Sequence, residues 1–145
     1  MNSSRFDKSI KVLSSRNEKT GLSTRAQLAD ALADSKITLA LTRLDNQPEL
    51  AEGIDTLTQR YWECMLSGVV ILGRAPQELI DIIGYDPVVH LDKDNANDQI
   101  LGILEHIEDY QELVDRNRQR ALEHGDWKVR IEWMMGVTKK LGYEV

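Results

Sequence analysis

Cysteine, proline and phenylalanine are scarce in this sequence, and the scarcity of cysteine excludes two classes of protein. Cys64 is the single cysteine among 145 residues, so neither a disulfide framework nor a zinc site built from several cysteines can form within the chain. The three histidines are scattered without the spacing of a metal-binding motif. We therefore expect no metal, no other cofactor and a reducing, cytoplasmic compartment.

Long hydrophobic runs and an excess of positive charge are also missing. No apolar run approaches the roughly 20 residues that a membrane-spanning helix needs, and the N-terminus lacks the apolar segment of a signal peptide. Eighteen Lys and Arg residues face 24 Asp and Glu residues, giving a net charge of −6. This balance argues against nucleic acid and acidic membranes as partners, but a helix N-terminus can still bind a small anion such as phosphate.

What the sequence does have is an alternation of short apolar strands and helices, with 41% hydrophobic and 29% charged residues. This pattern predicts one α/β domain over residues 1–145, with an open, doubly wound (Rossmann-like) parallel sheet followed by C-terminal helices. The expected strands are 9–15, 36–41, 69–73 and 86–92, and the expected helices are 24–35, 59–67, 75–84, 97–107, 108–125 and 126–142.

The polar segment 42–57 is longer than a simple connection requires, which is typical of a functional loop. It leads into the helix 59–67, for which Thr58 is the predicted N-cap and Gly68 the predicted C-cap. Ligands bind beyond the carboxyl ends of parallel strands, so this helix should point its free N–H groups into that crevice. A phosphate would fit there.

Glu63 is the residue of this helix that most needs an explanation. Tyr61, Trp62, Met65 and Leu66 should provide much of the packing around it, and a carboxylate in such surroundings needs a partner or an opening to solvent. It could accept two hydrogen bonds from a vicinal diol such as that of ribose. Arg60, three residues earlier, could neutralise Glu63 or turn toward a diphosphate.

Each candidate also has a purely structural interpretation. Arg60 and Glu63 can form an ordinary surface pair, and Asp55 can be a solvated or capping residue. His90, near the end of the last strand, is expected to be structural. The other acidic residues of the loop, Asp45, Glu49 and Glu52, are expected to form a solvated face. Cys64 is expected to be a small buried residue that fills space in the core.

Three features resemble the C-terminal, nucleotide-sugar-binding domain of GT-B fold glycosyltransferases of the "glycosyl transferases group 1" type. The first is an acidic residue and a Glu separated by seven residues, here Asp55 and Glu63. The second is "ECMLSGVVILG", which is similar to the family's "E-A-M-A-x-G-x-P-V-I" helix and strand. The third is the tail "ELVDRNRQRALEHGDWKVRIEWMM", with Trp127 and Arg130. The likeness covers roughly residues 26 to 135.

The resemblance implies binding of a nucleotide diphosphate sugar. It implies that Glu63 accepts hydrogen bonds from the ribose, that Asp55 contacts the donor sugar, and that amides near Leu57, Thr58 and Gln59 meet the diphosphate. Here Asp55 is shorter than the usual Glu, while Leu57 and Thr58 replace the commoner aromatic residue and Gly. Taken together, the helix argument and the resemblance give the expected nucleotide-sugar-binding residues, which are Asp55, Leu57, Thr58, Gln59, Arg60 and Glu63.

Family enzymes also have an N-terminal acceptor domain of similar size, so we expect an N-terminally truncated chain or a partner subunit, inactive alone. Half of a two-domain cleft cannot complete transfer. The alternative is a non-catalytic α/β interaction domain that kept the fold and lost the site. A small stand-alone enzyme of another doubly wound type is a third interpretation, disfavoured because no glycine-rich G-x-G-x-x-G loop, Walker loop or nucleophile elbow occurs.

Overall fold

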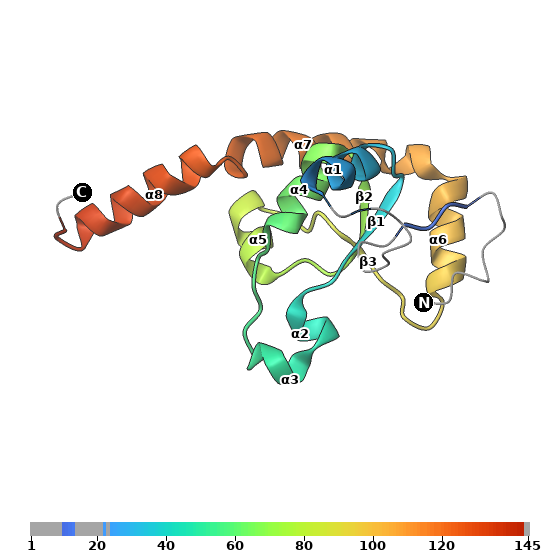
Figure 1. Ribbon diagram of the computed structural model, residues 1–145, viewed down its shortest axis with the longest axis horizontal. Helices are drawn as coiled ribbons and strands as arrows, with labels where there is room; N and C mark the ends of the chain where they lie inside the picture. The colour runs from blue at the N-terminus through green and yellow to red at the C-terminus, as the bar shows by residue number, and fades with distance from the viewer. Residues whose placement is uncertain (1–9, 14–21, 23, 144–145) are drawn as a thin grey trace.

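The computed structural model describes residues 10–13, 22 and 24–143, and these form a mixed α/β architecture around an open parallel sheet (Figure 1). The sheet has three strands in the order β1-β2-β3, which are β1 (Ile37–Ala40), β2 (Val70–Gly73) and β3 (Val89–His90). Both strand pairs are parallel. Their carboxyl ends therefore meet at one edge of the sheet.

Helices precede, connect and follow the strands. The sequence of elements confirms the predicted helices within a few residues at each end. The helices of the described residues, of which α2 and α3 were not predicted, are α1 (Arg25–Ala33), α2 (Arg43–Asn46), α3 (Pro48–Ala51), α4 (Gln59–Ser67), α5 (Gln77–Ile83), α6 (Ala96–Glu105), the 3-10 turn η3 (Ile107–Tyr110), α7 (Gln111–His124) and α8 (Trp127–Lys140).

Each face of the sheet carries its own hydrophobic cluster. Val70 and Leu72 pack with Ile100 and Ile103 of α6 on one face. Ile71 packs on the other face with the buried side of α4 and with residues of α1, α5 and α7. All four residues of β2 are buried, which explains why this strand is apolar without alternation.

The helix α4 is the main packing element on its face of the sheet. Tyr61, Trp62 and Met65 are buried as predicted, and Cys64 is fully buried. The prediction was wrong for Leu66, which is 40% exposed. Gly68 ends the helix in the left-handed conformation, with φ 71, as its position in the sequence predicted.

Three expected elements differ from the structure. Residues 10–13 of the expected strand 9–15 adopt no strand, and the rest of that range lies outside the described residues. The expected loop 42–57 contains the short helices α2 and α3, because Thr42 and Asp45 form a capping box and Pro48 begins α3. The expected strand 86–92 keeps two residues, since the strand follows Pro87, which lacks an N–H to donate to a neighbouring strand.

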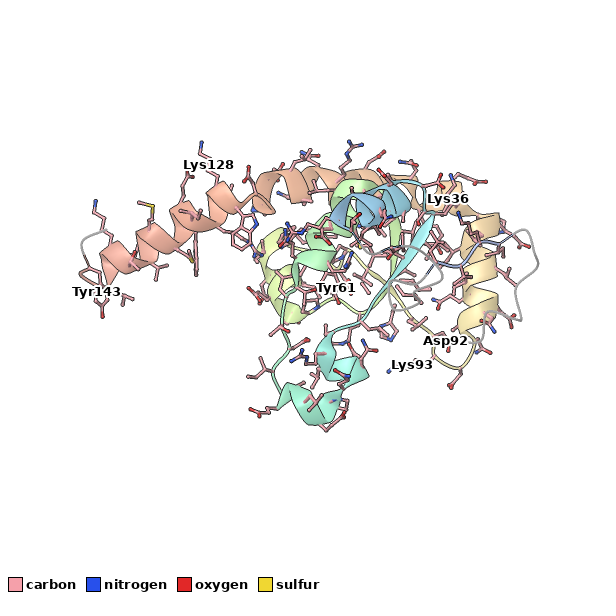
Figure 2. All side chains as sticks on the ribbon, in the orientation of Figure 1. Lys36, Tyr61, Asp92, Lys93, Lys128 and Tyr143 are labelled. Atoms are coloured by element: carbon pink, nitrogen blue, oxygen red, sulfur yellow. The ribbon has the colours of Figure 1, made fainter. Side chains whose placement is uncertain are left out.

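The helix α8 projects from the body as a single rod (Figure 1). None of its residues is buried, and the side chain sticks stand free along its length, from Lys128 to the following Tyr143 (Figure 2). At its base, the guanidinium of Arg130 lies 5.5 Å from the ring centroid of Trp62. Asp126 caps the helix by accepting a hydrogen bond from the amide of Lys128. Within the described residues, every helix is too short or too polar to span a lipid bilayer.

Candidate functional site

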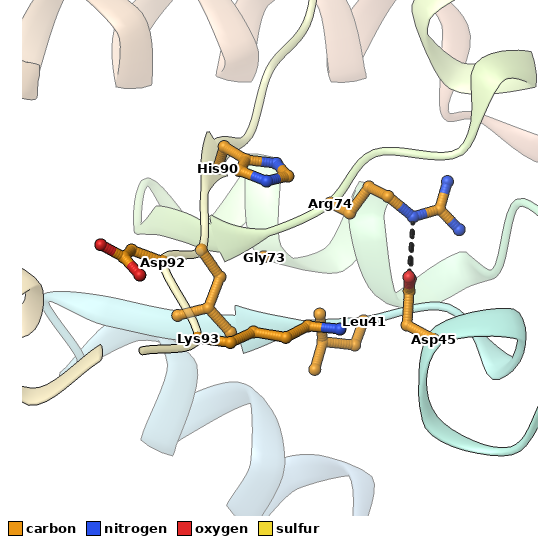
Figure 3. Close-up of a pocket in the computed structure, with 8 residues that line it drawn as sticks. Leu41, Asp45, Gly73, Arg74, His90, Asp92 and Lys93 are labelled. Atoms are coloured by element: carbon orange, nitrogen blue, oxygen red, sulfur yellow. Dashed lines mark hydrogen bonds and ion pairs between the residues drawn. The ribbon is translucent and has the colours of Figure 1, made fainter. Parts of the chain in front are cut away.

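A cleft of about 420 Å³ opens beyond the carboxyl ends of the three strands (Figure 3). The segments that leave β1, β2 and β3 each contribute to its walls. The crevice therefore lies at the edge of the sheet where ligands bind in open parallel folds. Its lining residues are Leu41, Asp45, Gly73, Arg74, His90, Leu91, Asp92 and Lys93.

Gly73 lets β2 end close against β1. Its φ of 154 lies outside the range that other residues adopt readily, and a Cβ at this position would overlap the carbonyl oxygen of Ala40. The amide of the next residue, Arg74, donates to the same carbonyl at 3.2 Å. This close approach fixes the backbone from which the Arg74 side chain enters the cleft.

The Arg74 guanidinium joins three residues that lie far from it in sequence. Its Nε donates to both carboxylate oxygens of Asp45, at 3.0 and 2.9 Å. Its two terminal nitrogens bind the two oxygens of Asp55, at 2.7 and 3.0 Å, in a bidentate pair. One of them also donates to the Thr42 hydroxyl at 2.7 Å. We call Thr42, Asp45, Asp55 and Arg74 the Arg74 cluster.

The charges of the Arg74 cluster stabilise one another. Burial alone would raise the pKa of Asp45, but hydrogen bonds from Arg74 and Thr42 outweigh it, so the pKa lies below its ordinary value. Hydrogen bonding from Arg74 likewise lowers the pKa of Asp55, and the two carboxylates raise the pKa of Arg74. Both carboxylates therefore stay ionised at neutral pH.

Tyr61 supports the cluster from behind. Its hydroxyl donates a 2.6 Å hydrogen bond to the carbonyl oxygen of Arg74, which ties α4 to the end of β2. The side chain is buried in the core cluster between α4 and the sheet. Burial raises the pKa of Tyr61 to about 12, so the phenol remains a hydrogen-bond donor at any physiological pH.

The wall formed after β3 is held in place by α6. The Gln99 amide donates to the carbonyl of His90 at 2.7 Å, and its oxygen accepts from the amide of Asp92 at 2.9 Å. Lys93 extends from this wall toward Leu41 on the opposite side of the cleft (Figure 3).

The predicted site residues divide into two groups in space. Asp55 is joined to the cleft through Arg74. Arg60 and Glu63 form an ion pair of 3.2 Å, with side chains 39% and 40% exposed, and neither lines the cleft. This ion pair is the one that the purely structural interpretation of Arg60 and Glu63 predicts, and it leaves Glu63 accessible to solvent.

The remaining predicted residues lie around the start of α4. Leu57 packs against the core, whereas Thr58 and Gln59 are exposed. Thr58 is the N-cap residue, but its side chain makes no capping hydrogen bond. Amide groups of the first turn are thus not covered by a cap side chain and can meet an anion.

Sequence reasoning missed Arg74, Thr42 and Lys93, and it wrongly made Asp45 part of a solvated face. Arg74 directly follows a buried strand and a glycine, and an ionic side chain at that place is a signal that could have been used. Glu49 and Glu52 are exposed, as expected.

The chemistry available in the cleft is mainly acceptance of hydrogen bonds. Two half-buried carboxylates surround one guanidinium, so the cluster keeps an excess negative charge. Carboxylate oxygens with unused lone pairs bind hydroxyl groups well. Among the described residues, no three His, Cys, Asp or Glu side chains gather as a metal site would require.

Comparison with known proteins agrees with the resemblance seen in the sequence. The sequence profile described as "glycosyl transferase-like" matches residues 5–136, which is most of the chain. No curated protein and no solved structure gave a match. The matched region includes all three strands, the helix α4 and every residue of the cleft. The chain belongs to the glycosyl transferase-like family.

Proposed function

We propose that this chain is the donor-binding domain of a glycosyltransferase of the GT-B type, and that it binds a nucleotide diphosphate sugar. The observation that carries the proposal is the position of Asp55. It belongs to the Arg74 cluster beside the cleft, and it lies just before the helix whose N-terminus and Glu63 are expected to hold the nucleotide.

Three parts of the site would then contact three parts of the ligand. The uncapped amides at the start of α4 would meet the diphosphate, assisted by the helix dipole. Glu63 would turn from Arg60 to the ribose hydroxyls, and Arg60 would become free to approach a phosphate. Asp55 would accept hydrogen bonds from the sugar. Transfer would require a second, acceptor-binding part, supplied by an N-terminal domain or a partner subunit.

Calorimetric titration with the diphosphates of uridine, guanosine and adenosine tests this proposal. We expect one of them to bind, and Glu63→Ala to weaken that binding by about tenfold through loss of two charge-assisted hydrogen bonds. Glu123→Ala is the matched control. Glu123 belongs to an i,i+3 pair of similar exposure with Arg120 on α7, so its loss should leave binding unchanged. The proposal would be refuted if none of the three nucleotides bound at millimolar concentration.

A non-catalytic interaction domain is the second candidate, and α8 is the observation that favours it. Trp127, Trp133 and Met134 are 58%, 69% and 52% exposed on this projecting helix, and exposed apolar patches commonly mark binding surfaces. If this alternative holds, the nucleotides give no heat of binding in the same titrations and do not raise the melting temperature. A pull-down then recovers a protein partner that binds the wild type but not Trp133→Ser.

A further inference from the structure

The Arg74 side chain has no donor left for a ligand. A guanidinium carries five N–H groups. In this structure Nε–H binds Asp45, and the four terminal N–H groups bind the two oxygens of Asp55, the Thr42 hydroxyl and, more weakly at 3.5 Å, the carbonyl of Ala75. Arg74 therefore acts on the cleft through the residues it holds.

What Arg74 holds is a set of acceptors. Asp45 Oδ2 is filled by bonds from Arg74 and from the hydroxyl and amide of Thr42. Its Oδ1 accepts from Arg74 alone, and each oxygen of Asp55 also accepts one bond from Arg74. Since a carboxylate offers about four lone-pair positions, unused positions remain on Oδ1 of Asp45 and on Asp55. Their side chains are 17% and 23% exposed, enough for a ligand hydroxyl to approach.

The charge around the cleft is negative after all pairings are counted. Asp45, Asp55 and Asp92 face two cations, Arg74 and Lys93, which leaves one negative charge with histidine uncharged. Lys93 is exposed, and an ion pair formed in water is worth little. The half-buried carboxylates would repel an added anion more strongly than Lys93 would attract it.

We propose that Arg74 is the positioning residue of the donor-sugar subsite: it fixes the acceptor oxygens of Asp55 and Asp45, and the subsite so formed prefers an uncharged sugar to a uronic acid. This inference rests on the proposed function, because it requires a nucleotide sugar with its sugar at Asp55. Arg74 sets the orientation of two carboxylates with one rigid, bidentate fork. A lysine would keep the charge and lose that orientation.

The test compares three ligands of the same base: the nucleotide diphosphate, its uncharged sugar conjugate and its uronate conjugate. UDP, UDP-glucose and UDP-glucuronate form one such set, and GDP, GDP-mannose and GDP-mannuronate form another. For the wild type we expect the uncharged conjugate to bind about fivefold tighter than the uronate. For Arg74→Lys we expect unchanged affinity for the bare diphosphate but loss of the extra affinity that the uncharged sugar provides.

A second variant and a control keep the result interpretable. Asp45→Asn removes one negative charge and keeps an acceptor oxygen. It should therefore reduce the difference in affinity between the uncharged conjugate and the uronate conjugate, and this can be measured even if Arg74→Lys folds poorly. Arg120→Lys, on α7 and away from the cleft, should change none of the three affinities. A purely structural role for Arg74 would weaken all three ligands by the same factor.

The failures of the two proposals can be told apart. If the diphosphate binds and Glu63→Ala weakens it, but the uronate binds as well as the uncharged sugar or Arg74→Lys weakens every ligand equally, the role of Arg74 is overturned and the proposed function stands. If no nucleotide binds to the wild type, both proposals fall.

Discussion

Replacing Arg74 by glutamine should destabilise the protein substantially, because two carboxylates would lose their shared partner. Removing one member of a buried ion pair costs about 3–5 kcal/mol. The Arg74 side chain is 31% exposed, so solvent screening reduces this to about 2 kcal/mol. For a chain of this length we expect the melting temperature to fall by about 4–8 °C.

The assay is urea unfolding followed by tryptophan fluorescence, with Arg120→Gln as the control. Arg120 forms an ion pair of 2.9 Å with Glu123, but those side chains are 44% and 41% exposed, so no measurable loss is expected. An equal loss in both variants would show that the Arg74 cluster contributes no more than a surface pair.

The pH dependence gives a sharper form of the same test. The folded-state pKa values of Asp45 and Asp55 lie below the ordinary value of 3.8, so their contribution is present above that pH and is lost as the pH falls through the folded-state values. Arg74→Gln removes the largest cause that lowers the two pKa values. The stability difference between wild type and variant should therefore shrink below about pH 4, and a difference that stays constant from pH 7 to pH 3 would refute this account.

Three further predictions concern buried groups. Asn117→Ala should lower the free energy of unfolding by about 2–3 kcal/mol, because the buried Asn117 side chain accepts from the Tyr85 hydroxyl at 2.8 Å and donates to a backbone carbonyl at 2.9 Å. Urea unfolding measures this loss, and an unchanged urea midpoint would contradict it. Gly73→Ala should cost about 3 kcal/mol or more through overlap with a β1 carbonyl, whereas Gly136→Ala, in open space on α8, should be neutral or stabilising; thermal melts compare them. Burial raises the pKa of Cys64 to about 11, so native protein should react with a thiol reagent at pH 8 far more slowly than urea-unfolded protein, and equal rates would refute the burial.

Local signals were enough to predict much of the fold. The apolar run of β2 and the C-cap Gly68 each depend on neighbours within a few residues, so the sequence contains the whole cause. The short helices α2 and α3 were missed although Thr42, Asp45 and Pro48 carry local signals of the same kind.

The Arg74 cluster could not be predicted in the same way. Arg74 binds Asp45 across 29 positions of sequence and Asp55 across 19, so no local pattern indicates the pairing. The acidic spacing from Asp55 to Glu63 drew attention to this region of the chain. The structure adds that Asp55 has a partner in Arg74, which lies 19 positions later in the sequence.

The segment from Thr42 to Asp55 is hydrogen-bonded at both ends to the side chain of Arg74, which lies outside the segment. Thr42 and Asp45 stand at its beginning and Asp55 at its end, and α2 and α3 lie between, away from the sheet (Figure 1). With the ends held together, added or removed residues between them cost little, because closing a somewhat longer loop costs only a fraction of a kcal/mol more, about 0.6 kcal/mol per doubling of length. Homologous chains can therefore vary in length and sequence between residues 46 and 54 while the cleft keeps its shape, except at Ala51, which is buried. A foreign peptide inserted after the exposed Gly53, beyond α3 and its buried Ala51, should be tolerated for the same reason.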